Sequence, residues 1–222
     1  MKLYDKEFIT NSILDFLSVF PKMYNTGRGK KNKKIYDESS TDKKIEIIKD
    51  RIKSSTERIY RPSIPPTVPD PVVSLVLEKY YEIENSKINE VSHEHKLSMA
   101  AENKVGEYLE LFIAHHGCED KSWVHCVDGM INKVDFIKKE NSKWILLQVK
   151  NRSNSENSSS SEIRQYIKNN DNIEIEKWHR VNAYTGKTNW DKFPDSNFKD
   201  YLSEKKFHIF VNKYLSDIKI NK

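Results

Sequence analysis

One short apolar segment in the second half of the chain restricts the possible folds. Residues Trp144–Lys150 form an apolar run that is interrupted only by Gln148 and ended by a lysine. A run of this length is typical of a strand that is buried on both faces, as in the centre of a sheet. Two shorter strands are expected before it, at 123–127 and at Val134–Ile137, and Asp128-Gly129 is a turn signal between them.

The rest of the chain shows mostly helical spacing. Apolar residues recur every three to four positions at 5–20, 41–60, 71–86 and 92–116, which predicts four helices. A last apolar run, Phe207–Val211, predicts a buried strand at the far side of the sheet. These elements together predict an α/β (α+β) fold, in which a mixed sheet of about five strands is flanked by helices.

Proline marks the expected joint between two parts of the chain. Five of the seven prolines lie between residues 62 and 71, where they block helix and remove backbone donors. We therefore expect a helical N-terminal region at 1–61, a connector at 62–71 and the main domain at 72–222. The stretch Gly27–Lys34 has no apolar residue, so it is expected to be a mobile basic loop, either solvated or touching phosphates.

Composition excludes several classes of protein. The 222 residues contain no apolar run long enough for a transmembrane helix, and the N-terminus lacks the apolar core of a signal peptide. Two cysteines do not make a disulfide framework, so a cytoplasmic protein without membrane association is expected. The net charge of +5 says little by itself, because the location of the charges matters more than their sum.

Three polar side chains interrupt the predicted strands at places that bring them together. Gln148 and Lys150 share one face of their strand, and a hairpin partner would carry Asp135 close to both. A carboxylate with an amide or backbone oxygen can hold Mg²⁺, and a neighbouring lysine can position water and offset phosphate charge. The alternative is that Asp135 caps a turn and that Lys150 merely extends its charge from a strand end.

These residues carry a resemblance to a known group of enzymes. Val134-Asp135, twelve intervening residues and then Gln148-Val149-Lys150 resemble the core motif of the PD-(D/E)XK nucleases. The Asn- and Ser-rich stretch Asn151–Ser161, with Lys177, Trp178 and Arg180 downstream, is similar to type II restriction endonucleases of the SinI type. The resemblance covers roughly residues 95–190. It implies a PD-(D/E)XK nuclease-like fold, Mg²⁺ and cleavage of both DNA strands at GGWCC, where W is A or T.

The sequence departs from the superfamily pattern at two positions. Val134 stands where proline is common, and Gln148 stands where Asp or Glu is usual. A neutral amide is a poorer Mg²⁺ ligand than a carboxylate, so we expect a further acid on the helix before the sheet to assist Asp135. Glu102 is the preferred candidate, and Glu107 and Glu110 are its rivals. The expected catalytic set is therefore Asp135, Gln148, Lys150 and Glu102, with Lys150 serving the water and the other three as metal ligands.

The polar segment after Lys150 is expected to reach DNA. Asn, Arg and Ser side chains bond phosphates and read base edges, and Arg or Lys suits guanine. Composition alone would equally fit a solvated loop, and the resemblance favours the functional interpretation. The expected DNA contacts are Asn151, Arg152, Asn154, Asn157, Ser158, Arg164, Lys177 and Arg180.

These expectations lead to a type II site-specific endodeoxyribonuclease as the first hypothesis. A palindromic site implies two active sites and therefore a homodimer on double-stranded DNA. A cognate DNA methyltransferase is implied genetically, because host DNA needs protection, but not as a bound partner. A repair or junction nuclease of the same fold, or a non-catalytic DNA-binding module, are the alternatives.

Overall fold

The computed structural model describes residues 5–27, 30–64, 66, 68, 70–117, 122–153, 170–198 and 200–220. The chain divides into two compact units. We call Met1–Ile59 with Leu109–Lys222 the sheet unit, and Tyr60–Tyr108 the helical unit. The domain boundaries expected from the prolines stay a prediction.

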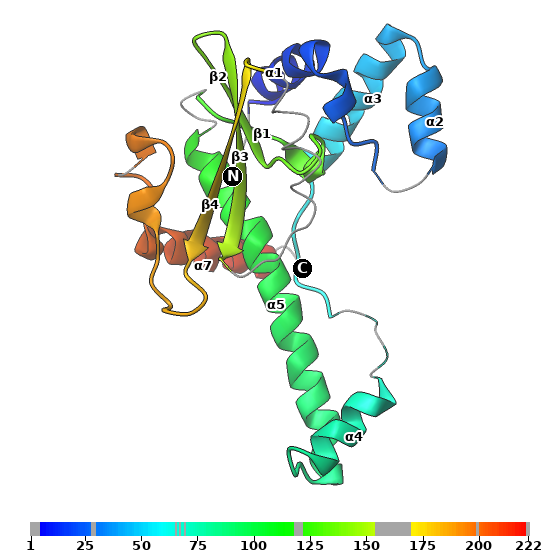
Figure 1. Cartoon of the computed structure of the whole chain (residues 1–222), viewed down its shortest axis with the longest axis vertical. Helices are drawn as coiled ribbons and strands as arrows, with labels where there is room; N and C mark the ends of the chain where they lie inside the picture. Colours follow the sequence, from blue (N-terminus) through cyan, green and yellow to red (C-terminus); the bar gives the residue numbers. More distant parts are fainter. Residues whose placement is uncertain are drawn as a thin grey trace. The chain divides into compact units, whose positions relative to one another are not determined.

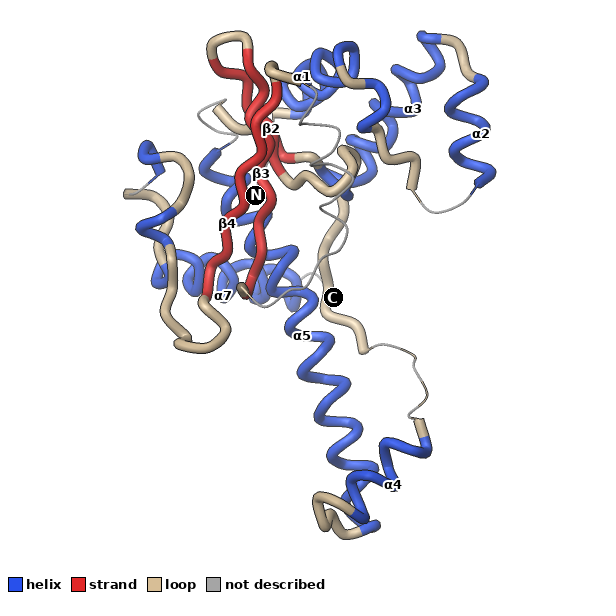
Figure 2. The backbone as a smooth tube through the Cα atoms, viewed as in Figure 1, coloured by secondary structure: helices blue, strands red, loops and turns tan. Residues whose placement is uncertain are grey.

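A mixed four-stranded sheet forms the centre of the sheet unit (Figures 1 and 2). Its strands are β1 (Val124–His125), β2 (Phe136–Glu140), β3 (Lys143–Arg152) and β4 (Ile173–Val181). They lie in the order β1-β2-β3-β4, antiparallel except for the parallel pair of β3 and β4. The α+β fold class is confirmed, and so is the interior place of the strand at Trp144–Lys150. The described residues hold four strands, where about five were expected.

A tight hairpin sets the register of β2 and β3. Glu140 pairs with Lys143, so only Asn141 and Ser142 make the turn. Both have positive φ, 47° and 70°, as a two-residue type I′ turn requires. This register places Phe136 opposite Leu147, and it brings the residue before Phe136 close to Gln148.

Two helices cover one face of the sheet. The apolar faces of α1 (Lys6–Val19) and α3 (Thr41–Thr56) supply Ile13, Phe16 and Ile52 to a core that also contains Trp144 and Leu146 of β3. The Phe16 and Trp144 rings meet edge to face, with their centroids 5.1 Å apart. The expected helix at 5–20 is confirmed, and the one at 41–60 ends four residues early.

Aromatic side chains fill the opposite face of the sheet. Trp178 of β4 packs against Trp190, with ring centroids 5.0 Å apart. Phe112 of α5 (Asn85–Gly117) lies 5.8 Å from Trp190 and 5.5 Å from Phe207 of α7 (Glu204–Ile220). The sheet is therefore enclosed between α1 and α3 on one side and the end of α5 with α7 on the other (Figure 1).

Two expectations about local structure were wrong. Phe207–Val211 is not a strand but part of the helix α7, since only Phe207 of the five is fully buried and Phe210 stacks on Tyr214 four residues later. The stretch expected as a basic loop continues as the helix α2 (Lys30–Glu38). Lysine is a good helix former, and Tyr36 at the end of α2 packs on Tyr24 at 4.3 Å.

The helical unit contains α4 (Pro71–Lys79) and the first part of α5. The Asp70 carboxylate accepts a hydrogen bond from Val72 N at 2.9 Å, and Pro71 begins the helix, a common way to start one. Compared with expectation, α4 is shorter and α5 is longer. In the part of the chain that the structure describes, no helix combines the length and apolarity needed to cross a membrane.

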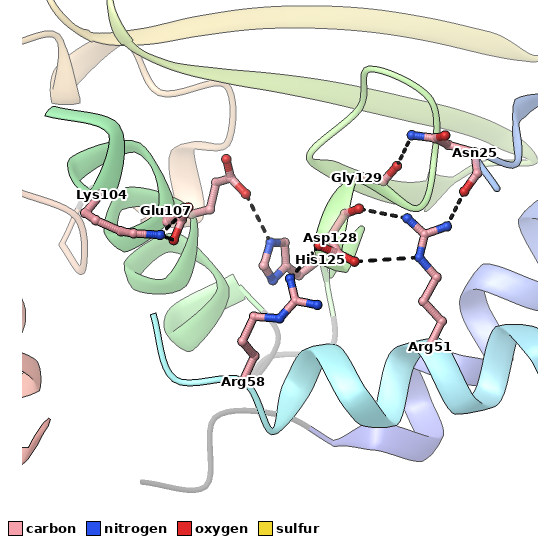
Figure 3. Close-up of polar contacts among 9 residues, drawn as sticks. Asn25, Arg51, Arg58, Lys104, Glu107, His125, Asp128 and Gly129 are labelled. Atoms are coloured by element: carbon pink, nitrogen blue, oxygen red, sulfur yellow. Dashed lines mark hydrogen bonds and ion pairs between the residues drawn. The ribbon is translucent and has the colours of Figure 1, made fainter. Parts of the chain in front are cut away.

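Two arginines, of which Arg51 makes more contacts, fasten the turn between β1 and β2 to α3 and the residues that follow it (Figure 3). Arg51 of α3 donates to the carbonyl oxygens of Asn25 and Asp128, the latter at 2.9 Å. Arg58 bonds the Asp128 carboxylate at 2.7 Å, and Asn25 Nδ2 donates to Gly129 O at 3.0 Å. These contacts hold the segment that leads into β2, and with it the position of Asp135.

Removing this anchor should destabilise the sheet unit. We expect Arg51→Ala to lower the free energy of unfolding by about 2 kcal/mol, because two carbonyl oxygens lose a charged donor. Urea denaturation followed by circular dichroism measures the change, with Lys49→Ala at an exposed position of the same helix as the control. Equal effects of the two substitutions would show that the arginine anchors nothing.

Candidate active site

Asp135 lies at the start of β2, where its backbone and side chain both bond neighbouring strands. Its N–H donates to Leu147 O at 3.0 Å, and its carbonyl accepts from Cys126 N at 2.8 Å. Its carboxylate accepts a hydrogen bond from Val149 N at 2.7 Å, so a side-chain oxygen takes the place of a strand partner. The carboxylate is thereby held against β3.

Gln148 and Lys150 lie on the same face of β3, as the sequence predicts. Gln148 is 6% exposed and donates through Nε2 to the carbonyl oxygen of Lys133, in the turn before Asp135. Lys150 is half-buried, and its positive charge favours the ionised form of Asp135. The structure therefore brings the three predicted residues together at one end of the sheet.

A second carboxylate acts on this group from α5. Glu110 raises the pKa of Asp135 through like-charge repulsion, and its Oε2 lies 3.4 Å from His125 Nε2. His125, shown in Figure 3, is 3% exposed. Its ring stacks on that of Phe136, with the ring centroids 5.0 Å apart. Sequence reasoning passed over His125, although an ionisable residue inside the apolar run 123–127 was a usable signal.

Burial and charge together set the protonation of Asp135. Burial is the larger cause and Glu110 the second, and they raise the pKa of Asp135 to about 7. The Val149 N–H and the Lys150 charge act in the opposite direction and only partly offset them. A site that resists holding two negative charges is one that a bound cation would stabilise.

The three candidate glutamates of α5 have different surroundings. Glu110 belongs to the sheet unit together with Asp135, and it is the one whose charge acts on that residue. Glu102 and Glu107 belong to the helical unit, where Glu107 pairs with Lys104 at 2.7 Å. We therefore prefer Glu110 as the assisting acid, and a role for Glu102 stays a prediction.

The donor atoms suit a hard divalent cation. Asp135 and Glu110 carry carboxylate oxygens, and Gln148, whose Nε2 donates to Lys133 O, carries an amide oxygen. Among the described residues no group of three or more His, Cys, Asp or Glu side chains could hold a metal ion. A cation bound here would therefore depend on two carboxylates, with further oxygens from Gln148, water or a phosphate.

The described members of the expected DNA-binding set lie on different faces of the sheet. Lys177 pairs in register with Gln148 and is exposed, and Arg152 is exposed at the end of β3. Arg180 instead donates to Asn151 Oδ1 at 3.0 Å, pairs with Glu204 of α7 and lies over the Phe207 ring at 5.1 Å. The remaining predicted contacts lie outside the described residues: Asn154, Asn157, Ser158 and Arg164.

Comparison with known proteins covers nearly the whole chain. The family model described as "SinI restriction endonuclease" matches residues 5–217. The type II restriction enzyme SinI of Salmonella infantis is 40% identical over 209 residues, which are 93% of this chain and 86% of the relative. The type II restriction enzyme Eco47I of Escherichia coli is 41% identical over the same shares. The family match therefore includes the N-terminal residues, whereas the motif resemblance covers only residues 95–190.

Neutralising Asp135 should stabilise the metal-free protein above neutral pH. The pKa of Asp135 is raised, so the protonated carboxyl favours the folded state. The stability that this proton contributes is complete below about pH 4 and is lost as the pH rises through about 7. Asp135→Asn should therefore raise the melting temperature at pH 8 by about 5 °C in EDTA and change it little at pH 4.5.

Thermal scans at the two pH values measure this difference. Asp191→Asn, at an exposed position, is the control and should give the same small shift at both. A destabilised Asp135→Asn at pH 8 would mean that the carboxylate is needed for folding, contrary to this expectation.

Proposed function

Because the chain belongs to the SinI restriction endonuclease family and is a type II site-specific DNA endonuclease, we propose that it cuts both strands of DNA at GGWCC with Mg²⁺. The observation that supports the site is the meeting of Asp135, Gln148 and Lys150 at one end of the sheet, with Glu110 acting on Asp135. The specificity is taken from the resemblance of the Asn- and Ser-rich segment and its downstream cations.

Each side chain of the site has a distinct task in this proposal. Asp135 and Glu110 hold the divalent cation, and Gln148 occupies the position where a carboxylate is usual. When bound, the cation polarises the scissile phosphate and lowers the pKa of water. Lys150 orients the attacking water and offsets the charge that develops on the phosphate oxygens.

The reaction is hydrolysis of a phosphodiester. The water oxygen forms a bond to phosphorus, the bond from phosphorus to the 3′ oxygen breaks, and the departing 3′ oxygen takes up a proton. The products carry a 5′-phosphate and a 3′-hydroxyl. The hydrogen bond from Val149 N to the Asp135 carboxylate supports this assignment, because a fixed carboxylate needs little reorganisation during the reaction.

The exposed cations beside the site support binding of a duplex. Lys177 lies next to Gln148 across the ladder, and Arg152 follows Lys150 on the same face of β3. Their charge and exposure support a role in contacting the phosphates of the bound duplex. Arg180 is engaged with Asn151 and Glu204, so we expect it to support the strand end rather than read a base.

A homodimer completes the proposal. Each chain contains one candidate site within the described residues, and cutting both strands of a palindrome requires two. A cognate DNA methyltransferase is expected in the same host, since GGWCC sites there need protection. It is implied as a genetic partner and not as a bound subunit.

The catalytic roles are tested by digestion of a sequenced plasmid. We expect wild-type protein with Mg²⁺ to give the fragments of a GGWCC digest, and Asp135→Ala or Lys150→Ala to reduce the cleavage rate at least 1,000-fold. Lys143→Ala, at the exposed start of the same strand, should cut normally.

A DNA-binding measurement distinguishes a variant that has lost only catalysis from one that has lost its fold. Asp135→Ala should still bind a GGWCC duplex in Ca²⁺, measured by gel shift. Wild-type protein that cuts no DNA with any divalent cation would refute the nuclease site and favour a DNA-binding module. Cleavage at branched or damaged DNA instead of GGWCC would favour a repair or junction nuclease.

The assisting acid is identified by comparing two glutamates of the same helix. We expect Glu110→Gln to raise the Mg²⁺ concentration for half-maximal cleavage at least tenfold, because the site loses one of two carboxylates. Glu102→Gln should leave it unchanged. If Glu102→Gln raises the Mg²⁺ requirement and Glu110→Gln does not, then Glu102 is the metal ligand and Glu110 is only a neighbour of His125.

A further inference from the structure

The helical unit exposes an unusual number of aliphatic side chains on α4. Val72, Val73, Leu75 and Val76 are 63%, 54%, 52% and 46% exposed. No residue of this nine-residue helix is buried. An exposed helix normally carries charged residues at such positions, because they cost no desolvation.

Three of these four side chains, together with Tyr80, form one continuous stripe. Val72, Val76 and Tyr80 follow each other at four-residue spacing, and Val73 lies beside Val76 three residues earlier. Ser74, Leu77 and Glu78 are the partly buried positions of the helix. The only charges of α4, Glu78 and Lys79, pair with each other at 2.7 Å.

We propose that this stripe, the α4 stripe of Val72, Val73, Val76 and Tyr80, is the surface on which a second copy of the chain docks. The inference rests on the proposed homodimer and names the part of the chain that forms it. It places self-association in the helical unit, whereas the proposed catalytic residues Asp135, Gln148, Lys150 and Glu110 belong to the sheet unit.

The exposed area matches what a dimer interface needs. With ordinary side-chain areas, the four aliphatic residues of α4 and the adjacent Tyr80 and Tyr81 (77% and 63% exposed) present about 300–600 Å² of mostly apolar surface. A standard interface buries about 800 Å² on each partner, of which roughly 60% is apolar. Six side chains can therefore supply most of the apolar part of one interface.

The chemistry of the stripe favours an identical partner. An isologous interface buries the same patch of both copies, so a charge within it would be buried twice, and one at the two-fold axis would meet its own copy. The α4 stripe contains no charged residue, and its helix can pack along a copy of itself through aliphatic ridges. The two active sites required for a palindrome are the functional reason for such a partner.

The surface is tested by placing two carboxylates in the stripe. We expect wild-type protein at micromolar concentration to have twice the 26.2 kDa chain mass by light scattering, and Val72→Glu with Val76→Glu to have the mass of one chain. The control carries the same charge change at Val19→Glu and Ile209→Glu, which are 54% and 59% exposed on other helices, and should remain a dimer. Circular dichroism checks that each variant is folded. Val76→Ser is a milder second variant and should raise the dissociation constant of the dimer at least tenfold.

Plasmid cleavage gives an independent readout. The double stripe variant should lower the ratio of linear to nicked product at least tenfold, because one chain cuts one strand at a time. A stripe variant that remains a dimer, or a control variant that dissociates instead, overturns the inference while the homodimer stands. Wild-type protein that stays a single chain with and without a GGWCC duplex overturns the homodimer as well. A dimer that cuts no DNA contradicts the proposed function, while the mass comparison still decides where the copies meet.

Discussion

The partly buried Asp135 carboxylate is the constraint around which the sheet unit is arranged. Its bond from Val149 N ties the start of β2 to the central strand, and burial with Glu110 raises its pKa to about 7. A carboxylate in this position would be unfavourable without the hydrogen bond and the Lys150 charge. The Arg51 anchor and the two-residue hairpin fix the backbone on both sides of it. Packing of the sheet and placement of the chemistry therefore depend on the same contacts.

Part of the structure could be predicted from sequence, and the reason is geometric. Strand alternation fixes which side chains share a face, so the convergence of Asp135, Gln148 and Lys150 followed from counting residues. Short apolar runs carry less information: Phe207–Val211 fits a strand or a helix, and only its partners in α5 and around Trp190 make it helical. The choice among Glu102, Glu107 and Glu110 was also beyond the sequence, because it depends on which turn of α5 lies beside the sheet.

Cations that look alike in the sequence have different surroundings in the fold. Arg180 is committed to Asn151, Glu204 and the Phe207 ring, so its charge helps to attach α7 to the sheet. Lys177, three residues earlier on the opposite face of β4, is exposed beside Gln148. Alternation along a strand thus separates a structural arginine from a lysine that is exposed on the opposite face. A count of basic residues contains no such distinction.

The covering of the sheet by α1 also has a consequence for the growing chain on the ribosome. The helix carries Ile9, Ile13 and Phe16, whose partners on β3 are Trp144 and Leu146, more than a hundred residues later. At about 5–20 residues per second, the apolar face of α1 is made roughly 6–25 s before the strand that buries it. During that interval α1 can pack against α3 and the turn that follows α1, but not against the sheet, and the nascent chain is exposed to aggregation. Production of this enzyme in quantity is therefore expected to depend on chaperones or slow, cool expression, for reasons set by the order of its elements.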